Sequence, residues 1–229
     1  MSVISCKQLS HRFFQAGKEN VILESINFDV NAGESCAIIG KSGSGKTTLL
    51  NLLGLLDTPS QGSIYLCGQN TQKLYKNDST LSLFRNKNIG FIFQFHHLLY
   101  EFTVLENVMM PFMIQNLKTK EFREKKEWGI HLLEKMGMID KINASVLHLS
   151  GGEQQRVAVA RALVHKPLIV LADEPTGNLD TELAMTVFKE ILDITHSYNG
   201  SAVIVTHDPE LARQTTTTHQ LSQHQLLRL

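Results

Sequence analysis

The chain has 229 residues, of which 42% are hydrophobic and 19% charged, and its 22 Lys and Arg residues balance its 22 Asp and Glu residues. This length fits one compact unit with a subdomain, and the composition excludes an intrinsically disordered chain. A net charge of zero gives no broad basic surface for a phosphate backbone, so we expect no nucleic-acid partner.

Neither a membrane span nor a secretory signal is expected. The longest apolar stretches, such as residues 108–114, fall far short of the roughly 18 residues that a span needs. The first residues lack a charged region followed by an apolar one, so we expect a protein that stays inside the cell. Cys6, Cys36 and Cys67 are odd in number and widely spaced, which favours reduced, packed thiols over disulfides or a zinc site.

The first expected elements are short strands with one buried face. Ile26, Phe28 and Val30 alternate with polar neighbours, which is the period of such a strand. Residues 3–6 and 64–66 show similar patterns. We expect these strands to form an antiparallel layer.

A glycine-rich loop follows a strand of a different kind. Residues 36–39 are apolar without alternation, as in strands that are covered on both faces of a parallel sheet. The next residues match the phosphate-binding pattern GxxxxGK[ST] and lead into a helix expected over 47–56: Gly40, Lys41, Ser42, Gly43, Ser44, Gly45, Lys46 and Thr47. The glycines let backbone N–H groups surround phosphate oxygens, Lys46 adds a positive charge, and Thr47 is a ligand for Mg²⁺. A turn that merely starts a helix would leave Lys46 and Thr47 unexplained, so we predict a P-loop that binds phosphate groups and Mg²⁺.

The middle of the chain, from 94 to 149, contains no strong buried strand. Residues 118–135 mix alternating charges with Trp128 and Leu132, as in a surface helix with one packed side. Another helix is expected over 153–165. We therefore expect a helical subdomain, at about 95–165, inserted in a sheet domain.

Two carboxylates and a histidine follow the remaining buried strands. Asp173 and Glu174 come after the strand at 168–172, and His207 follows the strand at 202–205. The carboxyl ends of parallel strands form the ligand-binding edge of an open α/β sheet. Asp173 is suited to holding Mg²⁺ and Glu174 to polarising the attacking water, while His207 would contact the γ-phosphate. A strand end or a cap would explain either carboxylate alone, and a lone histidine is usually structural, but the P-loop in the same chain favours the catalytic interpretation.

The C-terminal part predicts a short helix and a weak strand pair. Asp208 is placed to cap the helix, and Pro209 to begin it. The strand pair is expected beyond about residue 214. Metal binding by His219 and His224 is a minor hypothesis, because carboxylates are lacking nearby.

Residues 149–155, with the sequence Leu-Ser-Gly-Gly-Glu-Gln-Gln, resemble the signature motif of the ATP-binding subunits of ATP-binding cassette (ABC) transporters. Gln94 stands where that family has its Q-loop, Asp180 stands in the place of the D-loop, and Phe13 matches the aromatic residue that stacks on adenine. The resemblance covers the chain up to about residue 214. It implies an α/β fold with a RecA-like P-loop core, a mainly parallel sheet, an N-terminal antiparallel β layer and the inserted helical subdomain.

The resemblance also implies roles for single residues. Nucleotide binding is expected from the P-loop and from Phe13, Thr48, Ser150, Gly151, Gly152, Glu153 and Asp180. Mg²⁺ would be held by Thr47, Gln94 and Asp173, and catalysis would involve Glu174, His207 and Gln94. Because Ser150–Gly152 open a helix, they make a second phosphate site, which the family uses in a head-to-tail homodimer.

The run Phe-His-His-Leu-Leu after Gln94 narrows the resemblance to the ATPases of lipoprotein-releasing transporters. This implies an ATP hydrolase at the cytoplasmic face of the inner membrane that docks on integral membrane subunits and meets the lipoprotein cargo only indirectly. We expect the docking groove to be lined by Phe95, His97, Leu98 and Leu99.

Two alternatives stay open. The stretch 172–180 is shared with MacB-type exporters and FtsE-like division proteins. The second alternative is a soluble ABC ATPase that has no role in transport. Such relatives commonly have paired cassettes or long coiled-coil insertions. This chain has one P-loop, one signature and no sustained heptad pattern, which favours transport.

Overall fold

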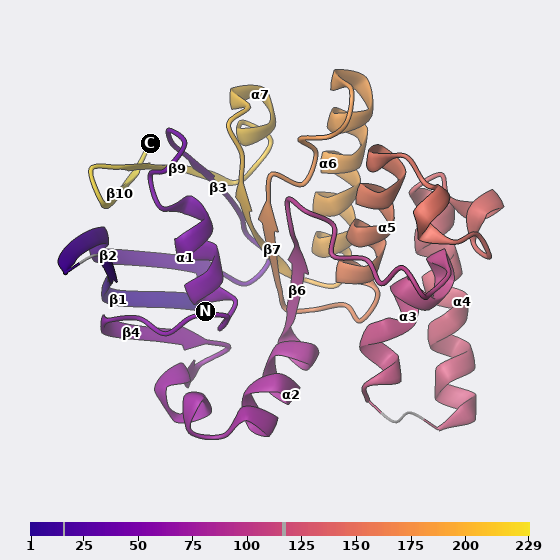
Figure 1. Ribbon diagram of the computed structural model, residues 1–229, viewed down its shortest axis with the longest axis horizontal. Coiled ribbons are helices and arrows are strands. Elements are labelled where there is room, and N and C mark those ends of the chain that lie inside the picture. Colours follow the sequence, from indigo (N-terminus) through magenta and orange to yellow (C-terminus); the bar gives the residue numbers. More distant parts are fainter. Residues whose placement is uncertain (16, 116–117) are drawn as a thin grey trace.

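The computed structural model describes residues 1–15, 17–115 and 118–229, which form two sheets flanked by helices (Figure 1). The four-stranded sheet lies on one side, the six-stranded sheet occupies the middle, and helices α3 to α6 lie on the other side. Across the described ranges, no helix is long and apolar enough to cross a bilayer.

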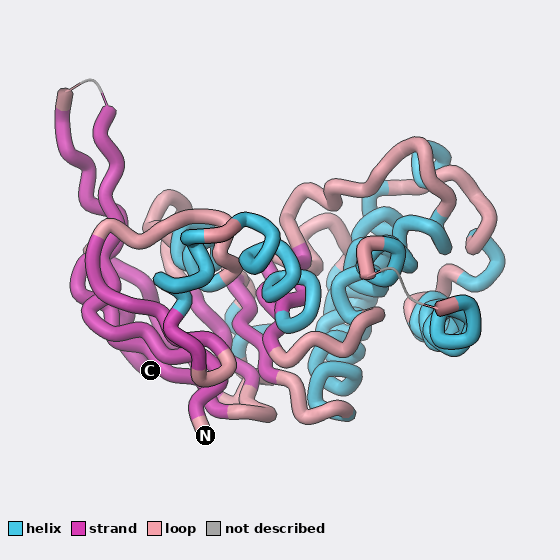
Figure 2. Tube along the Cα trace, turned by 90° about the horizontal axis from the view of Figure 1, so that it is seen from below, coloured by secondary structure: helices cyan, strands magenta, loops and turns pink. Residues whose placement is uncertain are grey.

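The four-stranded sheet has the order β2-β1-β4-β5 and is antiparallel. Its strands are β1 (Ser2–Gln15), β2 (Lys18–Asn31), β4 (Gln61–Leu66) and β5 (Gln69–Asn70). Ile26, Phe28 and Val30 are buried, which confirms the predicted alternation. The β1–β2 hairpin is longer than the alternating segments indicated, and its far half projects from the molecule (Figure 2).

The six-stranded sheet has the order β10-β9-β3-β8-β7-β6. Its strands are β3 (Ser35–Ile39), β6 (Ile89–Ile92), β7 (Ile169–Asp173), β8 (Ser201–Val205), β9 (Thr217–Ser222) and β10 (Gln225–Arg228). All pairs are parallel except β9–β10, and every residue of β7 and β8 is buried. The three predicted parallel strands are therefore confirmed.

The predicted strand pair of the tail is also confirmed, and β9 joins the central sheet beside β3. His219 packs within the fold: its Nδ1 lies 3.2 Å from Cys36 Sγ, and its ring meets Phe28 edge-on. In the part of the chain that the structure describes, no three His, Cys, Asp or Glu side chains group as a metal site. His219 thus has a packing role, as Cys36 does.

Three helices accompany the first half of the central sheet. Helix α1 (Lys46–Leu53) follows β3, and α2 (Asp78–Asn88) follows the 3₁₀ helix η1 (Thr71–Lys76). α1 ends three residues before the predicted residue 56, because Gly54 closes the helix and Leu55 takes a positive φ of 56°. One hydrophobic core lies between α1, the antiparallel sheet and the central sheet.

The helices after β6 form most of a second core. They are α3 (Val104–Met113), α4 (Thr119–Lys135), η2 (Ile139–Lys141), η3 (Val146–His148) and α5 (Gly151–Leu163), followed after β7 by α6 (Thr181–Ser197) and after β8 by α7 (Pro209–Ala212). The predicted helices at 118–135 and 153–165 are confirmed within two residues. α5 starts earlier than predicted because Ser150 caps it and Glu153 completes a capping box.

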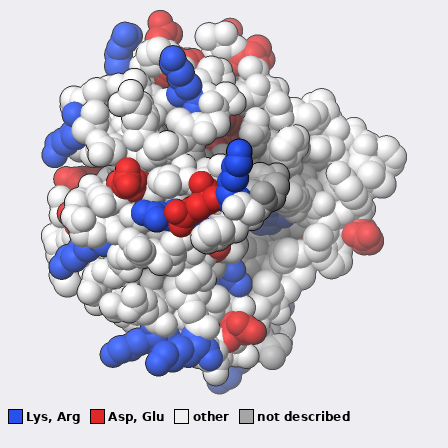
Figure 3. All heavy atoms as spheres, turned by 60° about the vertical axis from the view of Figure 1, so that its left-hand side comes forward, with Lys and Arg blue, Asp and Glu red and all other residues white. Residues whose placement is uncertain are grey.

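On the face that Figure 3 shows, Lys, Arg, Asp and Glu side chains are scattered over a mostly uncharged surface, with a short row of positive side chains at its lower edge. This intermixing agrees with the net charge of zero.

Candidate functional site

The P-loop joins the end of β3 to the start of α1. Gly43 and Gly45 have φ values of 75° and 100°, a region that residues with a Cβ atom rarely adopt. A Cβ atom on Gly45 would also lie 2.9 Å from Ile22 Cγ2. The loop therefore needs glycine at residue 45 for its backbone angle and for its close approach to β2.

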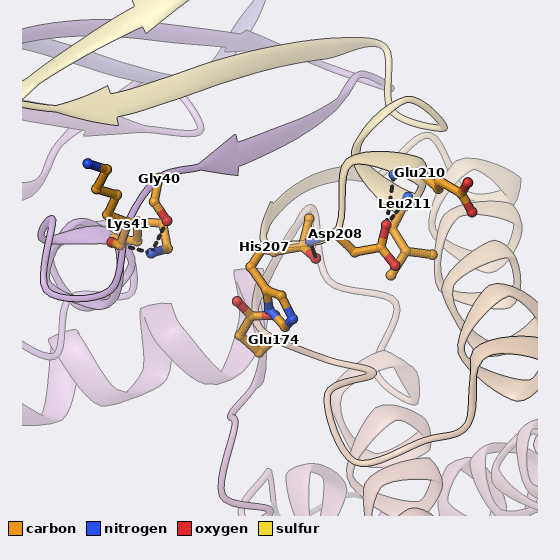
Figure 4. A network of polar contacts seen from close by, with 9 residues as sticks. Gly40, Lys41, Glu174, His207, Asp208, Glu210 and Leu211 are labelled. Carbon is orange, nitrogen blue, oxygen red and sulfur yellow. Dashed lines mark hydrogen bonds and ion pairs between the residues drawn. The ribbon is translucent and has the colours of Figure 1, made fainter.

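Lys46 reaches back across this loop. Its Nζ atom donates hydrogen bonds to the carbonyl oxygens of Gly40 (2.9 Å) and Lys41 (3.0 Å), which Figure 4 marks with dashed lines. The ammonium group is thereby fixed beside the N-terminus of α1, where free N–H groups and the helix dipole add positive potential. This arrangement suits a bound phosphate chain.

Thr47 and Asp173 join the start of α1 to the end of β7. The Thr47 hydroxyl donates a 2.7 Å hydrogen bond to Asp173 Oδ2, and Asp173 is buried. Gln94, which follows β6, lines the same cavity. A hydroxyl, a carboxylate and an amide oxygen are the donor set that Mg²⁺ prefers, so these residues fit that ion.

Glu174 and His207 meet at the ends of β7 and β8 (Figure 4). Glu174 Oε2 lies 3.0 Å from His207 Nδ1, and the Glu174 backbone N–H donates to Val205 O. Glu174 has a φ of 47°, a strained value for a residue with a side chain. The histidine side chain is 76% exposed and the glutamate only 17%, so the histidine covers a carboxylate that is largely shielded from water.

The helix after His207 holds this histidine at its sheet end. Asp208 Oδ1 accepts hydrogen bonds from the backbone N–H groups of Glu210 and Leu211, while Pro209 begins α7. The predicted cap and the predicted first residue are both confirmed.

A cavity of about 410 Å³ brings these residues together. It is lined by Ile22, Gly40, Ser42, Gly43, Gly45, Lys46, Thr47, Thr48, Gln94, Asp173, Glu174, Val205 and His207. A smaller cavity of about 140 Å³ shares Gln94, Glu174 and His207 and adds Gly177 and Asn178. Residues expected to bind phosphate, hold Mg²⁺ and act on water therefore face one space, although their positions span much of the chain.

Two P-loop residues lie outside that lining. Lys41 is exposed, and Ser44 is partly buried beneath the loop. Ile22 and Val205, by contrast, were not expected from the sequence. They carry no motif, and only the packing of β2 and β8 brings them to the cavity.

The signature residues lie outside this cavity, at the start of α5. Ser150 Oγ accepts from the Glu153 N–H, and the Glu153 carboxylate accepts from the Ser150 N–H and, at 2.5 Å, from Lys141 Nζ. The Lys141 bond, followed by the bond from Ser150, lowers the pKa of Glu153 to about 2. Gly151 is exposed, and a Cβ atom there would have open space. The helix N-terminus therefore presents Ser150 and Gly151 toward the outside of the chain, while Gly152 lies close against Leu179.

Asp180 and Phe13 also lie outside the cavity lining. Asp180 caps α6, since its Oδ1 accepts from the Leu183 N–H at 3.0 Å. Phe13 lies on β1 with 46% of its surface exposed, and its ring packs edge-on against His11 at 4.6 Å.

The segment after Gln94 turns its side chains to different sides. Phe95 is 75% exposed and Leu99 38%, but Leu98 is only 6% exposed and belongs to the second core. His97 has a φ of 47°, and this left-handed turn separates the outward His97 from the inward Leu98. Leu98 is therefore largely covered, although it reaches a cavity beside Phe95 and His97, and the docking groove stays a prediction.

Two further cavities lie along this segment. One of about 490 Å³ has a mainly apolar lining that includes Phe91, Phe93, His97, Pro111 and Arg161. The other, of about 420 Å³, is lined by Phe95, His96, His97, Leu98, Tyr100 and Gln154. Phe91 and Phe93 stack with ring centroids 4.1 Å apart, and His97 meets Phe93 edge-on.

Comparison with known families gives a match over residues 23–177 to the family described as ABC transporter. The chain is 47% identical over 210 residues to the lipoprotein-releasing system ATP-binding protein LolD of Pseudoalteromonas translucida (strain TAC 125), covering 92% of this chain and 88% of that one. It is 46% identical over 213 residues to LolD of Legionella pneumophila (strain Lens), covering 93% and 92%.

Among solved structures, the chain is similar to a dimeric post-hydrolysis state of the ATP-binding cassette MJ0796 bound to ADP and Pi. The TM-score is 0.88 at 32% sequence identity, with 97% of this chain and 96% of the other covered. Fold and sequence therefore agree over nearly the full length of both proteins.

Proposed function

The chain belongs to the ABC transporter family, and from this premise we propose that it is the ATP-binding and ATP-hydrolysing subunit of a lipoprotein-releasing system. The observation that carries the proposal is the meeting of Lys46, Thr47, Asp173 and Glu174 in one cavity, in a chain 47% identical to a LolD protein over 92% of its length. The protein works at the cytoplasmic face of the inner membrane, bound to integral membrane subunits.

The positions of the site residues support the following roles. The P-loop N–H groups and Lys46 bind the phosphate chain of ATP, and Thr47, Asp173 and Gln94 hold Mg²⁺. When bound, Mg²⁺ neutralises phosphate charge. Glu174 orients the attacking water and accepts its proton, while His207 holds the Glu174 carboxylate in place and reaches the γ-phosphate from the exposed side. Phe13 stacks on the adenine ring of ATP.

The signature motif acts on a second subunit. Ser150, Gly151 and Gly152 lie outside the cavity of their own chain, yet they present a hydroxyl and free N–H groups that suit an anion. The solved cassette MJ0796, which is similar to this chain, is dimeric. A head-to-tail homodimer places the signature of one subunit, with Glu153 and Asp180 beside the interface, over the ATP of the other.

The domain organisation is part of the same proposal. Residues 1–229 form a single ABC ATPase domain, and the helical subdomain, at about 95–165, carries the signature at the start of α5. The membrane subunits dock between the two parts, on Phe95, His97 and Leu99 and on the adjoining 490 Å³ cavity. Lipoprotein cargo meets the membrane subunits and touches this chain only indirectly.

The test is ATP-dependent release of a lipoprotein from membrane vesicles that contain this chain and the membrane proteins that co-purify with it. Glu174→Gln serves as the inactive control. We expect release with the wild-type chain and none with the variant. Co-purification with an exporter or a division protein, or release that is independent of ATP, would contradict the proposal.

A further inference from the structure

Arg161 on α5 makes an unusual pair of contacts with the segment that follows Gln94. Its Nη1 donates to His97 O at 2.6 Å, and its Nη2 donates to His96 O at 2.7 Å. Both bonds go to backbone carbonyls of one turn. None of the ion pairs among the described residues includes Arg161, so its positive charge is directed at this turn.

The guanidinium of Arg161 is largely buried, so its hydrogen bonds to the two carbonyl oxygens offset the loss of water. Burial lowers the pKa of its guanidinium to about 10, which leaves the group charged at neutral pH. A desolvated charge is unfavourable unless its donors are satisfied, and here two carbonyl oxygens accept from it. Only a planar guanidinium offers two donors in a fixed fork, so lysine cannot make both bonds equally well.

The opposite end of the segment is fixed to α3. The side chain of Asn107, which is fully buried, accepts from the Leu99 N–H at 2.8 Å and donates to the carbonyl oxygens of Leu99 and Phe102. The turn at 96–97 is thus attached to α5 and the residues from 99 onward to α3. Gln94, at the near end of the segment, lines the cavity with Asp173 and Glu174.

We propose that Arg161 is a positioning residue that ties the turn at 96–97 to α5, so that Gln94 keeps its place in the cavity when α5 carries the signature residues toward a second subunit. The proposal rests on the proposed function, because it takes the cavity as the ATP site. Arg161 does not touch nucleotide itself. It connects two residues that contact nucleotide in the proposed function. Arg161 is joined to Gln94 through the turn at 96–97 and to Ser150 through helix α5.

The experiment compares three variants of the full-length protein. Arg161→Gln removes the charge and the fork, Arg161→Lys keeps the charge alone, and Arg156→Gln is the matched control. Arg156 lies on the same helix and is partly buried, but its Nη2 donates to Met138 Sδ at 3.6 Å instead of to the turn. ATP dissociation constants, ATPase kcat and KM, and backbone hydrogen exchange of residues 94–99 are measured for each variant.

We expect Arg161→Gln to bind ATP within about twofold of the wild-type affinity, since the P-loop is intact, and to lose roughly tenfold in kcat. Exchange of the amides at 96–99 should accelerate. Arg161→Lys should recover part of the kcat, and Arg156→Gln should match the wild-type protein in both kcat and exchange.

Wild-type kcat and wild-type exchange in Arg161→Gln would overturn the inference, as would equal losses in Arg161→Gln and Arg156→Gln. If Arg161→Gln does not fold, Arg161→Lys decides, because an unchanged kcat and unchanged exchange in that variant would also overturn it. Absence of ATPase activity in the wild-type dimer would instead contradict the proposed function, so the two failures can be told apart.

Discussion

Glu174 combines a strained backbone with a shielded carboxylate. Its φ of 47° turns the side chain away from the direction of β7 and toward His207, with 17% of the side chain exposed. Strain of this kind persists only where the surrounding structure holds it, and it is concentrated at functional sites. The neighbouring Asp173 instead continues the strand and bonds to Thr47. Adjacent carboxylates thus contact different partners.

Replacing Glu174 with Gln should separate binding from hydrolysis. The amide keeps the shape of the side chain but cannot accept a proton, while Lys46, Thr47 and Asp173 stay in place. We expect ATP affinity within about twofold of wild type and a loss of at least about 100-fold in kcat. Calorimetric titration and a phosphate-release assay measure the two quantities. Near-normal turnover would remove Glu174 from the role of general base.

A second prediction concerns His165, whose Nε2 lies 3.1 Å from Ile89 O. Burial lowers the pKa of His165 to about 4, below its ordinary 6.5. The unfolded chain therefore takes up a proton at higher pH than the folded one, so the stability that the neutral ring provides is complete above pH 6.5 and falls as the pH drops toward 4.

Between pH 8 and pH 5 this residue should lower the free energy of unfolding by about 2 kcal/mol. His165→Gln keeps a donor for the Ile89 carbonyl but does not titrate. Urea unfolding of both proteins at the two pH values checks the prediction. The decline should be smaller in the variant by roughly that amount, and an equal decline would assign the effect to other groups.

At the scale of elements, the strands and helices that the sequence predicts are those with a clear hydrophobic pattern or capping residue. The α6 helix shows that one such signal was overlooked. Its buried residues Val187, Phe188, Ile191 and Leu192 recur at helical spacing behind the capping residue Asp180. The long hairpin of β1 and β2 is a different case, because register shifts interrupt its alternation. Periodicity in one strand does not predict where its partner slips.

The start of α1 offers a test of how an element is built against its neighbours. Gly45→Ala would place a methyl group at a φ of 100° and 2.9 Å from Ile22. Gly137→Ala is the matched control, since Gly137 also has a positive φ, of 64°, but open space around the added methyl. Both variants should lose about 1 to 2 kcal/mol from the backbone angle.

Gly45→Ala should lose more than the control, and it should also bind ATP more weakly, because β2 and the P-loop must separate. Thermal unfolding and nucleotide titration of the two variants provide the comparison. Equal stability losses and unchanged ATP affinity would show that the contact with Ile22 relaxes without consequence.

At the scale of the whole molecule, the signature and the P-loop lie in different parts of one chain, and in the proposed head-to-tail dimer a second copy completes each site. Ser150→Arg should bind ATP normally but fail to hydrolyse it, because bulk and charge fill the space of the neighbouring γ-phosphate. Lys46→Ala should bind ATP weakly, since it lacks the charge beside the phosphates.

Mixing these two inactive variants tests the geometry. Each mixed dimer combines the intact P-loop of the Ser150→Arg chain with the intact signature of the Lys46→Ala chain, so one composite site is restored. We expect ATPase activity to return in the mixture and to remain absent from each variant alone. Proven mixed dimers without any ATPase activity would contradict the head-to-tail arrangement.

The P-loop, the buried parallel strands, and the carboxylates and histidine at their ends could be predicted from the sequence. These features are readable because a glycine pattern, an unbroken apolar run and a polar residue after it are local, and because parallel strands present their ends at one sheet edge. The tertiary structure alone decided which distant groups touch: Thr47 with Asp173, Ile22 beneath Gly45, and Arg161 with the turn at His97. It also turned Leu98 inward while Phe95 stays exposed. Such contacts depend on the register and packing of separate elements, and a linear pattern carries neither.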